Sequence, residues 1–169
     1  FAKADAAGKS VGFLSPRDTV EVFVREGSIM VDYSRPFKRG RVIFGGIVPW
    51  DQVWRTGANN ATSVEITLKT MVIGDAKIPP GKYTLWTIPS RRGWTLIFNK
   101  QTGQWGTHYD PAQDLVRVDV KAETIAVPVE QFTIDIKPKS ETSPEGVMTL
   151  TWDRTRVIVP FRMEGELPK

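Results

Sequence analysis

The residues with the clearest capacity for chemistry are cations and tryptophans between residues 33 and 62. Four cations and no acid lie between Asp32 and Asp51, and a further arginine follows shortly after them. Guanidinium groups bind a carboxylate or a phosphate through two parallel hydrogen bonds, and an indole ring can stack on a planar or sugar-like group. The candidate binding residues of this segment are Arg35, Lys38, Arg39, Arg41, Trp50, Trp54, Arg55 and Asn59.

A simpler interpretation of the same segment needs no ligand. The cations can form a solvated basic loop, and the tryptophans can close the end of a hydrophobic core. Arg55 precedes a bend rich in glycine and asparagine, so we expect its guanidinium to be partly buried and hydrogen-bonded to backbone carbonyls or a carboxylate. Asp32 and Asp51 are the nearest acids in sequence that could balance the basic loop.

The single histidine, His108, lies in a polar and aromatic stretch together with Trp105, and both are further candidate binding residues. One histidine without a companion ligand pattern predicts no metal site, and the lack of cysteine excludes thiolate catalysis and iron–sulfur clusters. The chain also lacks the nucleophile-elbow, Walker A and dinucleotide-binding motifs. The sequence therefore predicts no catalytic residue, no metal and no cofactor.

Length and composition limit the class of protein. The chain has 169 residues, of which 40% are hydrophobic and 25% charged, as expected for one globular domain. The net charge of +4 favours acidic partners such as phosphate-bearing surfaces, but it is too small to indicate a nucleic-acid-binding protein. The longest apolar stretch without a charge, Val42–Trp50, has nine residues, whereas a membrane-spanning helix needs about 20.

The elements that must position these residues are strands. Apolar residues alternate with other residues in short runs separated by turn-forming residues, which predicts about ten short strands with one buried face. Such runs include Val20–Val24, Ile29–Tyr33, Val64–Leu68, Trp94–Phe98, Val116–Val120, Phe132–Ile136, Met148–Trp152 and Val157–Phe161. We therefore predict an all-β fold: a single-domain antiparallel β-sandwich, jelly-roll-like or barrel-like, over residues 11–169.

Two segments depart from this pattern. Pro49 and Gly57 bracket a stretch that predicts one short helical turn near residues 50–54. Residues 1–10 are small and polar, and they predict a flexible N-terminal lead like that of an exported protein whose signal peptide has been removed.

Several longer motifs resemble the DUF2911 family, a bacterial family of unknown function. They include Ser34–Arg41, Ile43–Gly46, Val48–Trp50, Val53–Asn59, Ile78–Tyr83, Trp94–Asn99 and Gln104–Gly106, and the resemblance runs roughly from Val20 to Phe161. It implies an exported, β-rich envelope protein. The family has no established activity that would assign a catalytic residue, and the resemblance places any shared site at Tyr33–Pro36 and Trp54–Asn59.

Together these features predict a non-catalytic, exported or periplasmic envelope module that binds a protein partner or an anionic ligand or surface. An extrinsic accessory subunit of a membrane-bound assembly is one form of this hypothesis, and association with a membrane surface is compatible with it. A carbohydrate-binding module and an enzyme that uses the Arg, Asn and His side chains of the loops are the alternatives. A cleft uniting Arg35, Arg55, Asn59 and His108 would favour the enzyme, whereas a flat row of exposed tryptophans would favour sugar binding.

Overall fold

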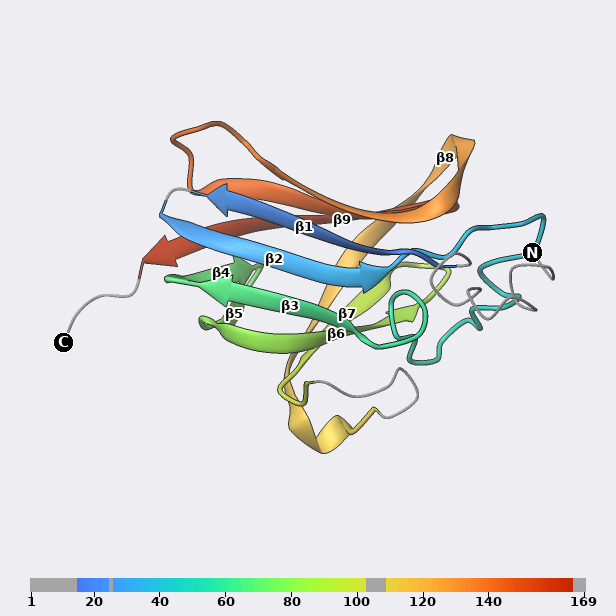
Figure 1. Cartoon of the computed structure of the whole chain (residues 1–169), viewed down its shortest axis with the longest axis horizontal. Coiled ribbons are helices and arrows are strands. Elements are labelled where there is room, and N and C mark those ends of the chain that lie inside the picture. Colours follow the sequence, from blue (N-terminus) through green and yellow to red (C-terminus); the bar gives the residue numbers. More distant parts are fainter. Residues whose placement is uncertain (1–14, 25, 103–108, 166–169) are drawn as a thin grey trace.

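A computed structural model describes residues 15–24, 26–102 and 109–165 of the chain, and it confirms the predicted all-β fold (Figure 1). Within the described residues, nine strands form one antiparallel sheet that folds over itself. The strands are β1 (Arg17–Val24), β2 (Gly27–Ser34), β3 (Thr62–Thr67), β4 (Lys69–Ile73), β5 (Ala76–Ile78), β6 (Gly81–Pro89), β7 (Trp94–Asn99), β8 (Asp114–Pro138) and β9 (Glu145–Gly165). Among the described residues, no helix is long and apolar enough to cross a membrane.

The sheet folds over because β8 belongs to both of its halves. The strand order is β1-β2-β3-β6-β7-β8-β9-β4-β5. The first part of β8 pairs with β7, its second part pairs with β9, and the end of β9 pairs with β4. Register shifts in the β8–β9 ladder, between Thr124 and Thr133, mark where the two strands bend. The two halves of the sheet therefore face each other like the layers of a sandwich.

The core lies between these two halves and follows the predicted alternation. Val31 and Val64 on one half and Ile134 and Leu150 on the other are at most 1% exposed. Val31, Val64 and Ile134 are buried while their neighbours along the strand are more exposed, as the period of two requires. Next to Leu150, Thr151 is buried as well. The same hydrophobic cluster unites both halves, so the described strands form one packed unit.

Two expectations about the elements need correction. The runs at 116–120 and 132–136 belong to the single strand β8, and those at 148–152 and 157–161 to β9, because bulges bend these strands without ending them. The helical turn expected near residues 50–54 is wrong: the one helix among the described residues is a 3-10 turn at Pro111–Gln113. Asp51 has a φ of 65°, and the N–H groups of Asp51 and Trp54 donate to carbonyls of β6 instead of closing a helical turn.

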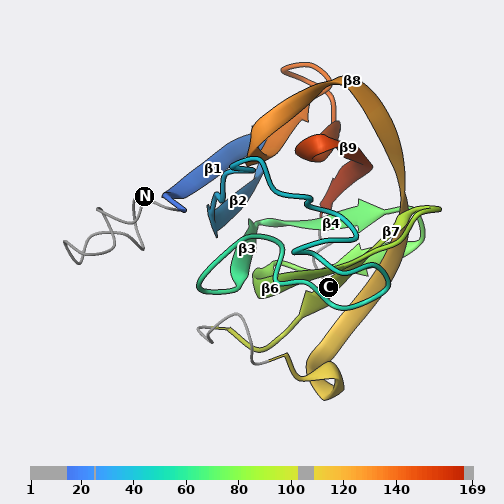
Figure 2. The same ribbon diagram turned by 90° about the vertical axis from the view of Figure 1, so that its right-hand side faces the viewer.

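The segment of residues 35–61 covers one end of the sandwich. It joins β2 to β3 and contains isolated bridges but no strand; two of these bridges connect it to β8 and β6, and a third, Phe44–Val48, lies within the segment. Figure 2 shows this end face-on, with the segment crossing it in front of the strands. Most of the residues that the sequence singles out are therefore gathered at one end of the fold.

Candidate functional site

A tight turn at Val42–Val48 forms the outer part of this end. The N–H groups of Gly46 and Val48 both donate to the carbonyl of Ile43, at 3.1 and 2.9 Å. A Cβ atom on Gly46 would lie 2.1 Å from the carbonyl oxygen of Val42, so only glycine allows the chain to turn this closely. The glycines noted in the sequence thus serve a compact turn at the surface.

The Trp54–Thr62 loop is held against β6. The N–H and carbonyl of Trp54 exchange hydrogen bonds with Thr87, at 2.7 and 3.0 Å. Thr56 is fully buried, its hydroxyl is 3.1 Å from that of Thr87, and its carbonyl accepts a bond of 2.6 Å from the Thr62 hydroxyl. Because these buried contacts fix Trp54 and Thr56, the side chain between them, Arg55, projects from a well-defined position.

Aromatic rings close the core beneath this loop. The indoles of Trp54 and Trp152 are stacked, with centroids 6.0 Å apart and planes inclined by 16°. Phe44, Trp94 and Phe132 pack against Trp54 at centroid distances of 5.1 to 6.1 Å. Trp54 therefore does close the end of the core, as the simpler interpretation of the sequence predicts.

A cavity of about 520 Å³ lies beside the stacked indoles and is called here the Arg55 cavity. It brings together four of the predicted binding residues, Arg41, Trp54, Arg55 and Asn59. The sequence did not single out Trp152, whose place in a regular strand pattern indicated only a core residue. Ile47 and Val53, which also line this cavity, carry no sequence signal that separates them from other apolar loop residues.

Arg55 has no counter-charge in the part of the chain that the structure describes. Its side chain is about half-buried as expected, but it makes no hydrogen bond or ion pair with any described residue. Burial alone lowers the pKa of its guanidinium, and no nearby carboxylate raises it again. The expected hydrogen-bond partner is thus missing from the described residues, and a partly desolvated cation faces the cavity.

Arg35 has a different role from Arg55. Its guanidinium turns toward β8, where it donates to the Phe132 carbonyl and the Thr133 hydroxyl, both at 3.0 Å. It also lies 3.5 Å from the carboxylate of Asp18. These contacts hold the residue that follows β2 against β1 and β8, so Arg35 is a structural arginine, and it does not line the Arg55 cavity.

The remaining basic residues lie at the surface around the cavity. Arg41 donates to the carbonyls of Lys38 and Phe37, at 3.0 and 2.6 Å, and keeps its charge at the cavity wall. The backbone N–H groups of Lys38 and Arg39 bind Glu130, and the Arg39 guanidinium lies 5.5 Å from the Phe37 ring. Lys38 and Arg39 do not line the Arg55 cavity.

The other candidates are placed apart from the cavity or are not described. Trp50 packs against Phe44 at 6.1 Å and lies beneath the guanidinium of Arg91 at 5.3 Å. Trp105 and His108 lie outside the described residues.

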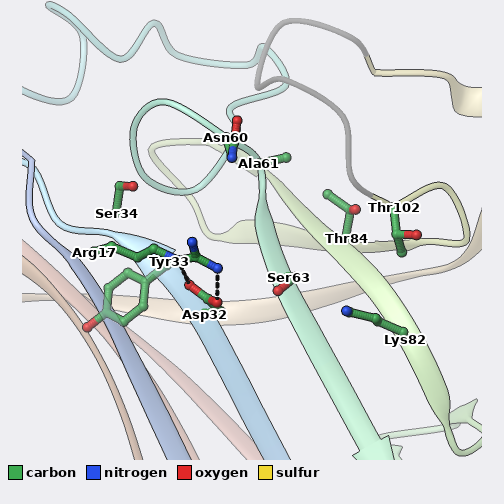
Figure 3. Close-up of a pocket in the computed structure, with 10 residues that line it drawn as sticks. All are labelled: Arg17, Asp32, Tyr33, Ser34, Asn60, Ala61, Ser63, Lys82, Thr84 and Thr102. Atoms are coloured by element: carbon green, nitrogen blue, oxygen red, sulfur yellow. Dashed lines mark hydrogen bonds and ion pairs between the residues drawn. The ribbon is translucent and has the colours of Figure 1, made fainter. Parts of the chain in front are cut away.

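A second, polar hollow of about 250 Å³ lies on the outer face of β2, β3 and β6 (Figure 3). Arg17 and Asp32 form a two-bond ion pair across it, at 2.6 and 2.5 Å, and this contact raises the pKa of Arg17. Lys82 extends from β6 toward Ser63 on the floor. Asp32, expected to balance the basic loop, is therefore engaged by Arg17 here. Because Asp32 already balances Arg17, this hollow has fewer unbalanced positive charges than the Arg55 cavity.

Comparison with known families agrees with the family resemblance of the sequence motifs. The family model DUF2911, described as "Protein of unknown function", matches residues 15–161, and the chain belongs to this family. The match covers both β2 and the whole 35–61 segment. No curated protein and no solved structure matches the chain.

Proposed function

We propose that this protein is a non-catalytic binding module that takes an anionic group into the Arg55 cavity. The observation that carries the proposal is the half-buried guanidinium of Arg55, which no described residue balances. A desolvated cation without a partner is unfavourable in the free protein, and an incoming carboxylate or phosphate restores the missing interaction. Arg41 at the wall adds a second positive charge.

The cavity lining favours binding over catalysis. Its described residues include two arginines and an asparagine but no carboxylate and no histidine, so they provide no general base and no activated nucleophile. Arg35 lies outside the cavity, and the cluster that would have favoured an enzyme is not assembled by the described residues. The proposal therefore assigns recognition, not bond breaking, to this end of the fold.

The aromatic rings favour an anion over a sugar. Stacking on a sugar needs an open indole face, but Trp54 is packed against four other rings and Trp50 lies between Phe44 and Arg91. The indoles of Trp54 and Trp152 instead provide an apolar wall beside two cations. This combination suits an anionic group attached to an apolar or aromatic body.

In the wider setting, we propose that the module acts in the bacterial envelope after export. The motif resemblance described above implies this location, and the net charge of +4 suits an anionic partner there. An accessory role in a membrane-bound assembly is compatible with a site that only binds.

The test is a titration followed by tryptophan fluorescence, with phenyl phosphate and benzoate as anionic probes and benzyl alcohol as the neutral probe. Two tryptophans line the cavity, so occupation should change the emission. Arg55→Met should weaken binding of the anions by about 10-fold or more, the contribution of one charge-assisted hydrogen bond. Arg156→Met, at a surface pair with Glu123, is the matched control and should bind normally. Equal affinity of wild type and Arg55→Met would contradict the proposal.

A further inference from the structure

We propose that the Val42–Val48 turn docks this end of the sandwich onto an anionic lipid surface. Val42 is 70% exposed and Ile47 is 48% exposed, and they are the outermost large apolar residues of this turn. Exposed apolar side chains next to a cluster of cations are typical of proteins that bind at a membrane interface. The inference goes beyond anion binding in the Arg55 cavity: it rests on the exposed Val42, which lies outside that cavity, while Ile47 and Arg41 belong to both surfaces.

The exposure of these two side chains is built into the turn. Their chain neighbours Ile43 and Val48 are 1% and 3% exposed and belong to the core cluster. The N–H of Ile47 donates to the carbonyl of Val42 at 3.0 Å, and the N–H groups of Gly46 and Val48 donate to the carbonyl of Ile43, so hydrogen bonds tie the backbone of the turn together. Because Ile43 and Val48 anchor the turn, Val42 and Ile47 cannot reach the core without breaking these contacts.

The charges around the turn are predominantly positive. Arg91 and Arg92 belong to the β6–β7 turn. Two contacts show that this turn lies at the same end: Arg91 covers the Trp50 ring, and the Pro89 carbonyl accepts a hydrogen bond from the Asp51 N–H. The positive residues of this end are Lys38, Arg39, Arg41, Arg91 and Arg92. Two acids lie among them: Asp51, which is hydrogen-bonded to Pro89, and Glu130, which is hydrogen-bonded to Lys38 and Arg39. The excess of cations matches the negative charge of an anionic bilayer.

The opposite end provides an internal comparison. It also exposes apolar residues, with Phe23 at 69%, so exposure alone does not identify a membrane-binding surface. Its cations, however, are next to acids: Lys69 lies 3.9 Å from Glu26, and Lys139 lies 3.4 Å from Glu145. Only the 35–61 end of the described structure combines projecting apolar side chains with an excess of positive charge.

A lipid surface fits this end better than a protein partner. The apolar side chains project from a narrow turn, whereas the centre of a protein interface is normally a well-packed patch with aromatic anchors. Phe44, in the turn, packs against Trp50, and the guanidinium of Arg91 covers Trp50. A headgroup layer has no fixed shape, so it accommodates two projecting side chains while its phosphates contact the cations.

The experiment measures co-sedimentation of the whole protein with vesicles of phosphatidylcholine alone and of phosphatidylcholine mixed with phosphatidylglycerol. Wild type should bind the anionic vesicles, and binding should fall with added salt. Val42→Asp should weaken binding by about fivefold or more, the effect of one charge near an anionic surface plus the lost apolar contact. Val42 is not part of the Arg55 cavity, so phenyl phosphate binding should remain as in wild type.

The matched control is Phe23→Asp, which places the same charge at an equally exposed apolar position of the opposite end. It should bind vesicles like wild type. Absence of wild-type binding to anionic vesicles, an equal loss in both variants, or full binding by Val42→Asp would each overturn the proposal. The first result would leave a protein partner as the occupant of this surface. Arg55→Met should still bind anionic vesicles like wild type, because the turn is unchanged. Loss of phenyl phosphate binding together with normal vesicle binding in this variant would show that the two proposals stand or fall separately.

Discussion

Replacing Arg55 by methionine should leave the fold as stable as wild type or slightly more stable. Methionine keeps a long apolar stem in place of the arginine side chain but removes the charge. Because no described residue pairs with the Arg55 guanidinium, the substitution breaks no ion pair or hydrogen bond among them. It also removes a cation whose charged form is disfavoured by burial.

The size of the effect follows from the half-burial of Arg55. A half-exposed charge is partly screened by water, so we expect a gain in unfolding free energy between zero and about 1 kcal/mol. For a chain of this length, 1 kcal/mol corresponds to about 2–4 °C in Tm. The Tm of Arg55→Met should therefore equal that of wild type or exceed it by up to about 4 °C.

Arg35→Met is the matched comparison, since it makes the same chemical change at an arginine with partners. It leaves the Phe132 carbonyl and the Thr133 hydroxyl without their donor at a side chain that is only 24% exposed. Loss of hydrogen bonds to a charged group destabilises by about 1.5–3 kcal/mol, which corresponds to a Tm about 3–12 °C lower. Calorimetry gives the Tm and urea unfolding gives the unfolding free energy of wild type, Arg55→Met and Arg35→Met.

The reasoning fails if Arg55→Met melts as far below wild type as Arg35→Met does. Arg55 would then be a structural arginine, and its apparent lack of a partner would not make it a binding group. The stability measurement is thus independent of the ligand titration.

Two further outcomes test the turn and the core. Gly46→Ala should lower the unfolding free energy by about 1–3 kcal/mol, because its methyl group would lie 2.1 Å from the Val42 carbonyl oxygen. The matched control is Gly165→Ala, whose new methyl group would contact only the flexible end of the Lys69 side chain. Its unfolding free energy, measured with urea, should change little. Burial raises the pKa of Tyr33, so the folded state keeps this proton longer than the unfolded state. The contribution of Tyr33 to the free energy of unfolding is therefore complete below about pH 10, the usual pKa of tyrosine, and is lost as pH rises through the raised pKa. Urea unfolding on both sides of pH 10 should show that the unfolding free energy falls less with pH in Tyr33→Phe than in wild type. An equal fall in both proteins would contradict this assignment.

The strand content and the position of the irregular segment at one end of the fold follow from the sequence alone. Alternation such as Val157–Phe161 predicts a half-buried strand because successive side chains in extended backbone point to opposite faces. The cations, tryptophans and glycines at residues 33–62 interrupt that alternation and set this segment apart before any contact is known. These signals are local, since each depends only on neighbouring residues.

Only the tertiary structure decides which arginine is structural and which faces a cavity. Arg35 and Arg55 look alike in sequence, but Arg35 finds its partners on β8, 97 and 98 residues away, while Arg55 projects from a loop anchored on β6. Trp152 joins the cavity because β9 bends back over the aromatic rings. Side chains so distant in sequence meet through the bends and register of long strands, and no local pattern encodes that pairing.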